Sequence, residues 1–214
     1  MIKMLRFFYW FLWKKSNFSQ SDEEQVIKKI FKNKAKGFYV DVGCYHPRRY
    51  SNTAYLYKIG WNGVNIDADI NNLSLFKFFR RRDFNLNYFV SDKKKYIDFC
   101  IFNERALNGI YNEERLQIIK KRGYKPRNFK KIETFSLDEI LSLNNLQDKE
   151  IDFLDIDAEG HDLEVLKSIN LKSRKIKLIL IEVGDEKKNI DLYLKDHGYS
   201  EYFKEDRNVF YLKN

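Results

Sequence analysis

The stretch GFYVDVGCYHPRRYSNTAYLYKIGWNGVNIDAD, residues 37–69, decides the fold class of this chain. It opens with an apolar, β-branched run over residues 37–43, which ends in Asp and Gly as a buried parallel strand does. Ser-Asn-Thr at residues 51–53 can begin a helix, and Gly60 can end it. A second apolar run over residues 63–68 predicts the next strand. Strand, helix and strand in this order form the repeating unit of a parallel sheet.

The same alternation continues to the end of the chain. Further strands are expected at residues 86–91, 95–102, 151–157, 176–183, 199–203 and 208–212. Helices are expected at residues 71–82, 112–122, 162–169 and 188–197, with a short helix that starts at Ser136. The strand at 95–102 alternates apolar and polar residues and suits an edge hairpin, whereas most of 104–131 gives no assignment. The pattern as a whole predicts an α/β sandwich with a mostly parallel sheet.

The composition fits one folded domain with a short extension. The chain has 214 residues, of which 43% are hydrophobic and 16% aromatic, so it can bury a core. Its formal net charge is +9, and residues 1–36 hold +6 of this through nine basic and three acidic residues. We therefore divide the chain into a basic, aromatic, helical extension at residues 1–36 and a main domain at 37–214. A nucleic-acid partner is disfavoured, because little of the excess charge lies on the main domain.

An aromatic segment, MLRFFYWFLW at residues 4–13, lies between Lys3 and the pair Lys14-Lys15. It is too short to span a bilayer, which needs about 20 residues, and no small-residue cleavage site follows it. Two interpretations remain open: residues 1–15 form an interfacial helix at a membrane surface, or they pack their aromatic side chains on protein. The two cysteines, Cys44 and Cys100, form no zinc motif; a reducing compartment is expected, with a disulfide as the alternative.

Acidic residues stand at the ends of four predicted strands. They are Asp41, Asp67, Asp157 and Glu182. Ligands of an open parallel sheet bind outside the carboxyl ends of its strands, so we expect these side chains to gather around one site.

The turn after the first strand favours a nucleoside ligand. Gly43 lets a ligand approach the backbone, but the residues after it lack the later glycines of a dinucleotide-binding loop. Asp67 follows Gly43 by 24 residues, at the end of the second strand, where a carboxylate can accept hydrogen bonds from ribose hydroxyls. A nucleoside without a pyrophosphate points to S-adenosylmethionine as the cofactor.

Two stretches carry a family resemblance. Residues 37–69 together with IDFLDIDAEGHDLEVLKSI at 151–169 resemble the FkbM family of S-adenosylmethionine-dependent methyltransferases. The most specific parts are Ser-Asn-Thr followed by Gly-Trp, and the Asp-x-Glu-Gly-His tract. The chain differs at Asp155, where members often have Lys, and at Cys44, where members often have Ala.

The resemblance implies both a fold and an activity. The fold is a Rossmann-like class I methyltransferase sandwich with a mostly parallel seven-stranded sheet and an antiparallel C-terminal strand. The activity is O-methylation of a hydroxyl on a sugar, glycan or sugar-nucleotide precursor, of the surface-polysaccharide type. We expect the protein in the cytoplasm, and at the inner face of the membrane if residues 1–15 form the interfacial helix. An RNA methyltransferase and a non-catalytic, membrane-docked nucleoside-binding module are the alternatives.

The resemblance also implies roles for the residues that would bind the cofactor. These are Asp41 and Gly43 at the methionine end, Asp67 at the ribose, Ser91 and Asp92 at the adenine side, and Asn52 at the helix start. Two of these assignments have a purely structural alternative. For Asn52, with Thr53, a helix cap is preferred over a cofactor contact, whereas Ser91-Asp92 fits a plain turn equally well.

The catalytic candidates lie at the tip of the fourth predicted strand and in the first loop. A sugar hydroxyl needs a base, and His161 is preferred because its unperturbed pKa of about 6.5 leaves much of it neutral near pH 7. His46 is the second candidate, and Asp157 and Glu159 lie beside His161 in the sequence. Glu159 also fits a simple acid at a helix N-terminus.

Further candidates concern a metal and the acceptor. Asp157, Glu159, Glu182 and His161 contain the ligands that Mg²⁺ or Mn²⁺ would prefer. We do not favour a metal, since carboxylates alone can orient a sugar. Four residues are expected to bind substrate: Tyr45, Arg48, Arg49 and Glu182. Tyr50 and Trp61 are aromatic candidates for a sugar pocket, although Trp61 also fits the core.

Overall fold

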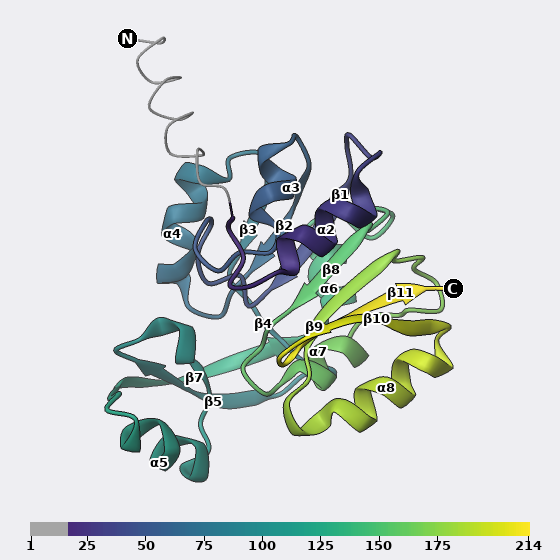
Figure 1. The fold of residues 1–214 in the computed structure, drawn as a ribbon. Helices are drawn as coiled ribbons and strands as arrows, with labels where there is room; N and C mark the ends of the chain where they lie inside the picture. Colours follow the sequence, from purple (N-terminus) through teal and green to yellow (C-terminus); the bar gives the residue numbers. More distant parts are fainter. Residues whose placement is uncertain (1–16) are drawn as a thin grey trace, which may run out of the picture.

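The computed structural model describes residues 17–214 (Figure 1). The predictions for residues 1–15 therefore lie outside the described residues. None of the described helices combines the length and the apolar character that crossing a membrane requires. Cys44 and Cys100 are both buried, free thiols, so the disulfide alternative is wrong.

A seven-stranded sheet forms the centre of the structure, in the order β10-β11-β9-β8-β1-β2-β3. Its strands are β1 (Phe38–Val42), β2 (Asn62–Ile66), β3 (Phe84–Leu86), β8 (Phe153–Ile156), β9 (Leu178–Glu182), β10 (Tyr199–Glu205) and β11 (Asn208–Lys213). β11 runs antiparallel to both of its neighbours, and the other six strands run in one direction. The predicted α/β fold with a mostly parallel sheet is confirmed. The strand order reverses beside β1, which pairs with β2 on one side and β8 on the other, and such switch points are where ligands bind.

Helices cover both faces of this sheet (Figure 1). They are α2 (Glu23–Phe31), α3 (Ala54–Lys58), α4 (Ile70–Phe79), α6 (Leu137–Leu143), α7 (Asp162–Lys167) and α8 (Lys187–Asp196). Alternation along β1 separates two cores, because neighbouring side chains of a strand point to opposite faces. Val40 lies in the core with α6, α7 and α8, whereas Tyr39 lies in the core with α2, α3 and the fully buried Trp61.

A second sheet of four strands, in the order β4-β7-β5-β6, stands beside the first (Figure 1). It consists of β4 (Phe89–Val90), β5 (Tyr96–Phe102), β6 (Gly109–Ile110) and β7 (Pro126–Phe135), with a short 3₁₀ turn, η1 (Arg105–Leu107), and the helix α5 (Glu113–Lys121). The predicted strand at 86–91 is wrong as one element. Its first residue ends β3 of the central sheet, and residues 89–90 form β4 of the second sheet.

The first six residues of the long strand β7, 126–131, lie in the part of 104–131 that has no predicted element. Residues 127–131 of β7 are exposed, so they lack the apolar alternation that marks a half-buried strand. The second sheet is also strongly basic, since residues 93–131 contain twelve Lys or Arg and four Asp or Glu. The positive charge of residues 37–214 is therefore concentrated on this sheet.

Candidate active site

A cleft opens at the carboxyl ends of β1, β2 and β8, with about 910 Å³ of space inside and at its mouth. The strand tips of the central sheet contribute Gly43, Asp67, Asp157 and Glu159 to its walls. The second sheet contributes the opposite wall, including Phe89 and Phe99. A concave site that joins apolar walls to a few polar groups is typical of a small-molecule site.

Gly43 forms the floor of the cleft through a close backbone contact. Its φ angle is +85°, a conformation that side chains disfavour, and its N–H donates to the Ile66 carbonyl. A β-carbon at this position would lie 1.8 Å from the Asp157 carbonyl oxygen. Only glycine therefore lets the turn after β1 pass against the turn after β8.

Asp67 presents a buried carboxylate beside this floor. Its Oδ1 accepts a hydrogen bond from the Asp69 N–H at 2.7 Å, and its Oδ2 accepts from the Tyr45 N–H at 3.1 Å and Asn72 Nδ2 at 3.0 Å. The residue is 8% exposed, and burial raises its pKa to about 6 although these hydrogen bonds oppose the rise. A carboxylate has about four acceptor positions, so one remains for a ligand.

The wall next to Asp67 is apolar. The rings of Phe89 and Phe99 meet edge to face with centroids 5.9 Å apart, and Ala68 packs against the same cluster. A carboxylate flanked by an apolar wall can hold a nucleoside, whose ribose carries hydroxyls and whose base has flat apolar faces.

Asp157 lies where this cleft meets an acidic hollow. The side chain of Asp157 is exposed to solvent. Its pKa is nevertheless raised well above the ordinary value, first through desolvation by the surrounding protein and then through repulsion by Glu182 and Glu159. Carboxylate oxygens of Asp157, Asp162 and Glu182 lie within 4.8 Å of one another. Of the predicted metal ligands, Asp157 and Glu182 are thus close together, and Asp162 stands with them in place of Glu159 and His161.

Two of these acids already have partners. Asp162 accepts hydrogen bonds from the Ala158 N–H at 2.7 Å and the Gly160 N–H at 3.0 Å. Glu182 forms an ion pair with Arg207, with 3.1 Å between Oε1 and Nη1. Asp157 is the member of the cluster that these contacts do not involve.

Glu159 connects the two sheets at the cleft. Its Oε2 accepts a hydrogen bond from Arg115 Nη2 at 3.0 Å, and Arg115 belongs to α5. The same Arg115 nitrogen donates to the Leu107 carbonyl. The backbone of Glu159 has a positive φ angle of 54°, which non-glycine residues seldom adopt. The hydrogen bond from Arg115 holds the side chain of this residue at the cleft.

Neither His161 nor His46 belongs to the lining of the cleft. His161 is 7% exposed, with Nε2 3.0 Å from Ser91 Oγ and Nδ1 3.4 Å from Glu164 Oε2, and burial lowers its pKa. His46 Nδ1 accepts hydrogen bonds from the backbone N–H groups of Arg48 and Arg49, at 3.1 and 3.0 Å. The ring proton of neutral His46 is therefore on Nε2, and Nδ1 is engaged. Neither position supports the predicted role of base.

Several predicted cofactor contacts lie away from the cleft wall. Strand alternation turns Asp41 toward α3, where its Oδ2 accepts from Thr53 Oγ1 at 2.6 Å, and Asn52 Nδ2 donates to Asp155 Oδ1 at 3.3 Å. Thr53 occupies the N-cap position of α3, but its side chain makes no capping hydrogen bond to the helix. Ser91 is buried and directed toward His161, and Asp92 accepts from Ser91 Oγ at 3.5 Å.

Of the predicted substrate residues, some line the cleft and others lie away from it. Tyr45 lines the cleft, and its hydroxyl donates to Glu104 Oε1 at 3.1 Å. Arg48 lies over the Phe79 ring and Arg49 over the Tyr50 ring, and neither arginine belongs to the cleft wall. Glu182 lines the adjoining hollow, which shares Asp157 with the cleft.

Sequence reasoning missed the wall formed by the second sheet. Phe89 follows β3 so closely that it reads as part of the same strand, and Phe99 reads as part of an edge hairpin. Arg115 lies in the helix expected at residues 112–122, but nothing in its sequence pattern indicates a contact with Glu159. The one available signal was the apolar alternation of Ile97, Phe99 and Ile101, which marks a face that must be covered.

Buried carboxyls predict how stability depends on pH. Burial raises the pKa of Asp41 and Asp67 to about 6 and that of Asp162 to about 7, from 3.8. The folded state then binds protons more tightly than the unfolded chain, so these groups stabilise the fold in acid, and the contribution is lost as pH rises from about 4 to about 7. The free energy of urea unfolding should be about 2–5 kcal/mol lower at pH 7.5 than at pH 5.

A matched pair of variants identifies the source of this dependence. Asp67→Asn should reduce the difference between pH 5 and pH 7.5, because the side chain no longer titrates. Asp148→Asn, at an exposed position, should change neither value. Stability that rises with pH over this interval would contradict the assignment.

A comparison with known protein families finds a match that includes the strands around the cleft. The family model described as Methyltransferase FkbM domain matches residues 41–201, which is 161 of the 214 residues. The match begins within β1 and ends within β10, so it includes all the strand tips that form the cleft. No curated protein and no solved structure matches the chain.

Proposed function

We propose, because the chain belongs to the family of FkbM methyltransferase domains, that it transfers a methyl group from S-adenosylmethionine to a hydroxyl of a sugar, glycan or sugar-nucleotide precursor. One observation carries the proposal: the Gly43 turn and the Asp67 carboxylate flank a single cleft that leads to Asp157. A Rossmann-like class I sheet is part of the proposal. Its support is the strand order, with β11 inserted antiparallel between β9 and β10.

The cleft has the chemical features that this cofactor requires. Asp67 would accept a hydrogen bond from one ribose hydroxyl, Phe89 and Phe99 would contact the adenine, and the backbone at Gly43 would meet the methionine end. When bound, the cofactor supplies an electrophilic methyl group on a sulfonium. The protein then has to position the acceptor oxygen in line with that methyl group, which supplies much of the rate.

The acceptor side is rich in carboxylates, which hydrogen-bond sugar hydroxyls. Asp157 is the acid that faces both the cleft and the adjoining hollow, and we assign it the role of general base. Its raised pKa makes it a stronger proton acceptor than an ordinary aspartate. Glu159, held by Arg115, and Glu182, held by Arg207, would orient the acceptor.

A second candidate acceptor is RNA, which the positive charge on the second sheet favours. We also retain a cytoplasmic location, with peripheral membrane contact through residues 1–15.

Methyl transfer from a radiolabelled donor tests the proposal directly. The purified protein is incubated with neutral sugars, sugar nucleotides, bacterial glycans and RNA, each with and without a chelator. We expect label in a saccharide as an alkali-stable ether, changed by the chelator less than about twofold because Asp157, not a metal, removes the proton. Label in RNA alone would favour the second candidate, and dependence on a divalent ion would place one among the acids near Asp157.

A further inference from the structure

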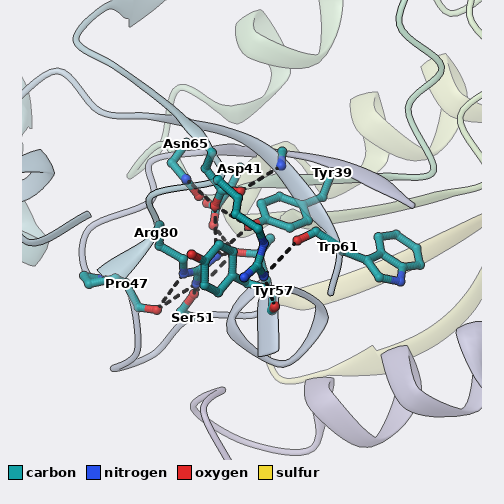
Figure 2. Close-up of polar contacts among 12 residues, drawn as sticks. Tyr39, Asp41, Pro47, Ser51, Tyr57, Trp61, Asn65 and Arg80 are labelled. Carbon is teal, nitrogen blue, oxygen red and sulfur yellow. Dashed lines mark hydrogen bonds and ion pairs between the residues drawn. The ribbon is translucent and has the colours of Figure 1, made fainter. Parts of the chain in front are cut away.

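A completely buried guanidinium packs against the segment that follows β1. It belongs to Arg80, the residue that follows α4, and Figure 2 shows it enclosed by polar groups. All five of its N–H donors have acceptors. Nε and Nη2 donate to the Pro47 carbonyl at 3.0 and 2.7 Å, and Nη2 also donates to Ser51 Oγ at 2.9 Å. Nη1 donates to the Tyr39 hydroxyl at 2.9 Å and to Thr53 Oγ1 at 3.2 Å.

Three of these four partners belong to one segment, residues 43–53, which we call the cleft loop. The loop begins at Gly43 and carries Tyr45 and Tyr50, which line the cleft. Both tyrosines have positive φ angles, of 47° and 53°. Non-glycine residues hold this conformation only where their surroundings enforce it. The loop therefore needs an anchor, and Arg80 provides the largest set of side-chain contacts to it.

The anchor is connected to the cofactor side of the cleft. Arg80 fixes the Pro47 carbonyl, and two residues earlier the Tyr45 N–H donates to Asp67 Oδ2. The charge of Arg80 is balanced by the buried Asp83, 3.7 Å away, and by Asp41, which is reached through the Thr53 hydroxyl. A lysine would keep the charge but has only three donors, so it cannot hold all of these partners.

We propose that Arg80 is a positioning residue for cofactor binding, which it supports by holding the cleft loop in the form that binds. The identity of the ligand rests on the proposed function, whereas the claim about the loop does not. Arg80 touches no reacting atom, and its effect reaches the cofactor through Tyr45 and Asp67.

The test compares Arg80→Lys with a control of similar stability loss, Leu141→Ala. Leu141 is fully buried in α6, in the core on the other face of the sheet. Hydrogen exchange of residues 43–53 is measured without cofactor, and binding of S-adenosylmethionine is measured by calorimetry. Arg80→Lys should speed exchange of the loop and raise the dissociation constant about tenfold, if the competent fraction falls to about a tenth. The value of kcat at saturating cofactor should stay close to wild type.

Leu141→Ala should lower the melting temperature but leave both loop exchange and affinity near wild type. The milder Ser51→Ala removes one acceptor and should shift both quantities in the direction of Arg80→Lys. The proposal is overturned if Arg80→Lys matches wild type in exchange and affinity, or if Leu141→Ala shifts both equally. If the wild-type protein does not bind S-adenosylmethionine, the proposed function fails, while the exchange comparison still tests the loop.

Discussion

Asp157→Asn is expected to lower kcat about 10²- to 10⁴-fold, the usual contribution of a positioned general base. Asparagine keeps the shape of the side chain but cannot accept the proton of the acceptor hydroxyl. It also removes one charge from a group of acids that repel one another, so the variant should be at least as stable as wild type. Steady-state methyl transfer and thermal unfolding together separate loss of the base from loss of the fold.

The pH profile and a second variant sharpen this prediction. A base must be deprotonated, so the kcat of the wild-type protein should fall as pH drops through the pKa of Asp157. Because that pKa is raised, the decline should begin at a higher pH than for an ordinary carboxylate. His161→Gln should leave kcat nearly unchanged, since the ring is buried against Ser91. Full turnover by Asp157→Asn, with loss of turnover by His161→Gln, would reverse the assignment.

Gly43→Ala is expected to abolish cofactor binding and to destabilise the protein by about 2–5 kcal/mol, from the left-handed backbone and the overlap combined. The added β-carbon would meet the Asp157 carbonyl oxygen at 1.8 Å, so the tips of β1 and β8 must separate. This displacement occurs in the floor of the cleft, between the two groups that would contact cofactor and acceptor. Calorimetric titration and urea unfolding measure the two effects.

Gly123→Ala is the matched control for this substitution. Gly123 has a similar φ angle, +88°, but a β-carbon there would have no atom within 4 Å. Gly123→Ala should lower the free energy of unfolding by about 1–2 kcal/mol, because a side chain disfavours the left-handed backbone conformation. Cofactor binding should remain intact. Equal losses for the two variants would show that the contact between the strand tips is unimportant.

The predicted site residues that line the cleft include three whose position follows from chain direction alone. Gly43, Asp67 and Asp157 each follow a strand of a parallel sheet, and such ends must meet at one edge. Asp41 differs because it lies within its strand. Side chains of a strand alternate with a period of two, so Asp41 lies on the same face as Tyr39. Tyr39 packs in the core that contains α3, and Asp41 therefore points toward α3.

Other features depend on contacts between distant segments, which no local pattern reveals. The direction of the His161 ring is set by Ser91, seventy residues away. Arg80 stands in a run of three arginines that resembles a solvated face, yet its burial follows from acceptors in residues 39–53. The strand β7 is exposed along most of its length and is formed by pairing with β5 rather than by its own sequence pattern.

Calorimetric titration of the purified protein with S-adenosylmethionine decides whether the cleft binds the cofactor. We expect one site per chain with a dissociation constant of about 1–100 μM, in the range usual for enzyme substrates. Asp67→Asn should weaken it about 10- to 100-fold, because hydrogen bonds to a charged group contribute about 1.5–3 kcal/mol. Absence of binding by the folded wild-type protein, or unchanged binding by Asp67→Asn, would contradict the assignment of the cleft.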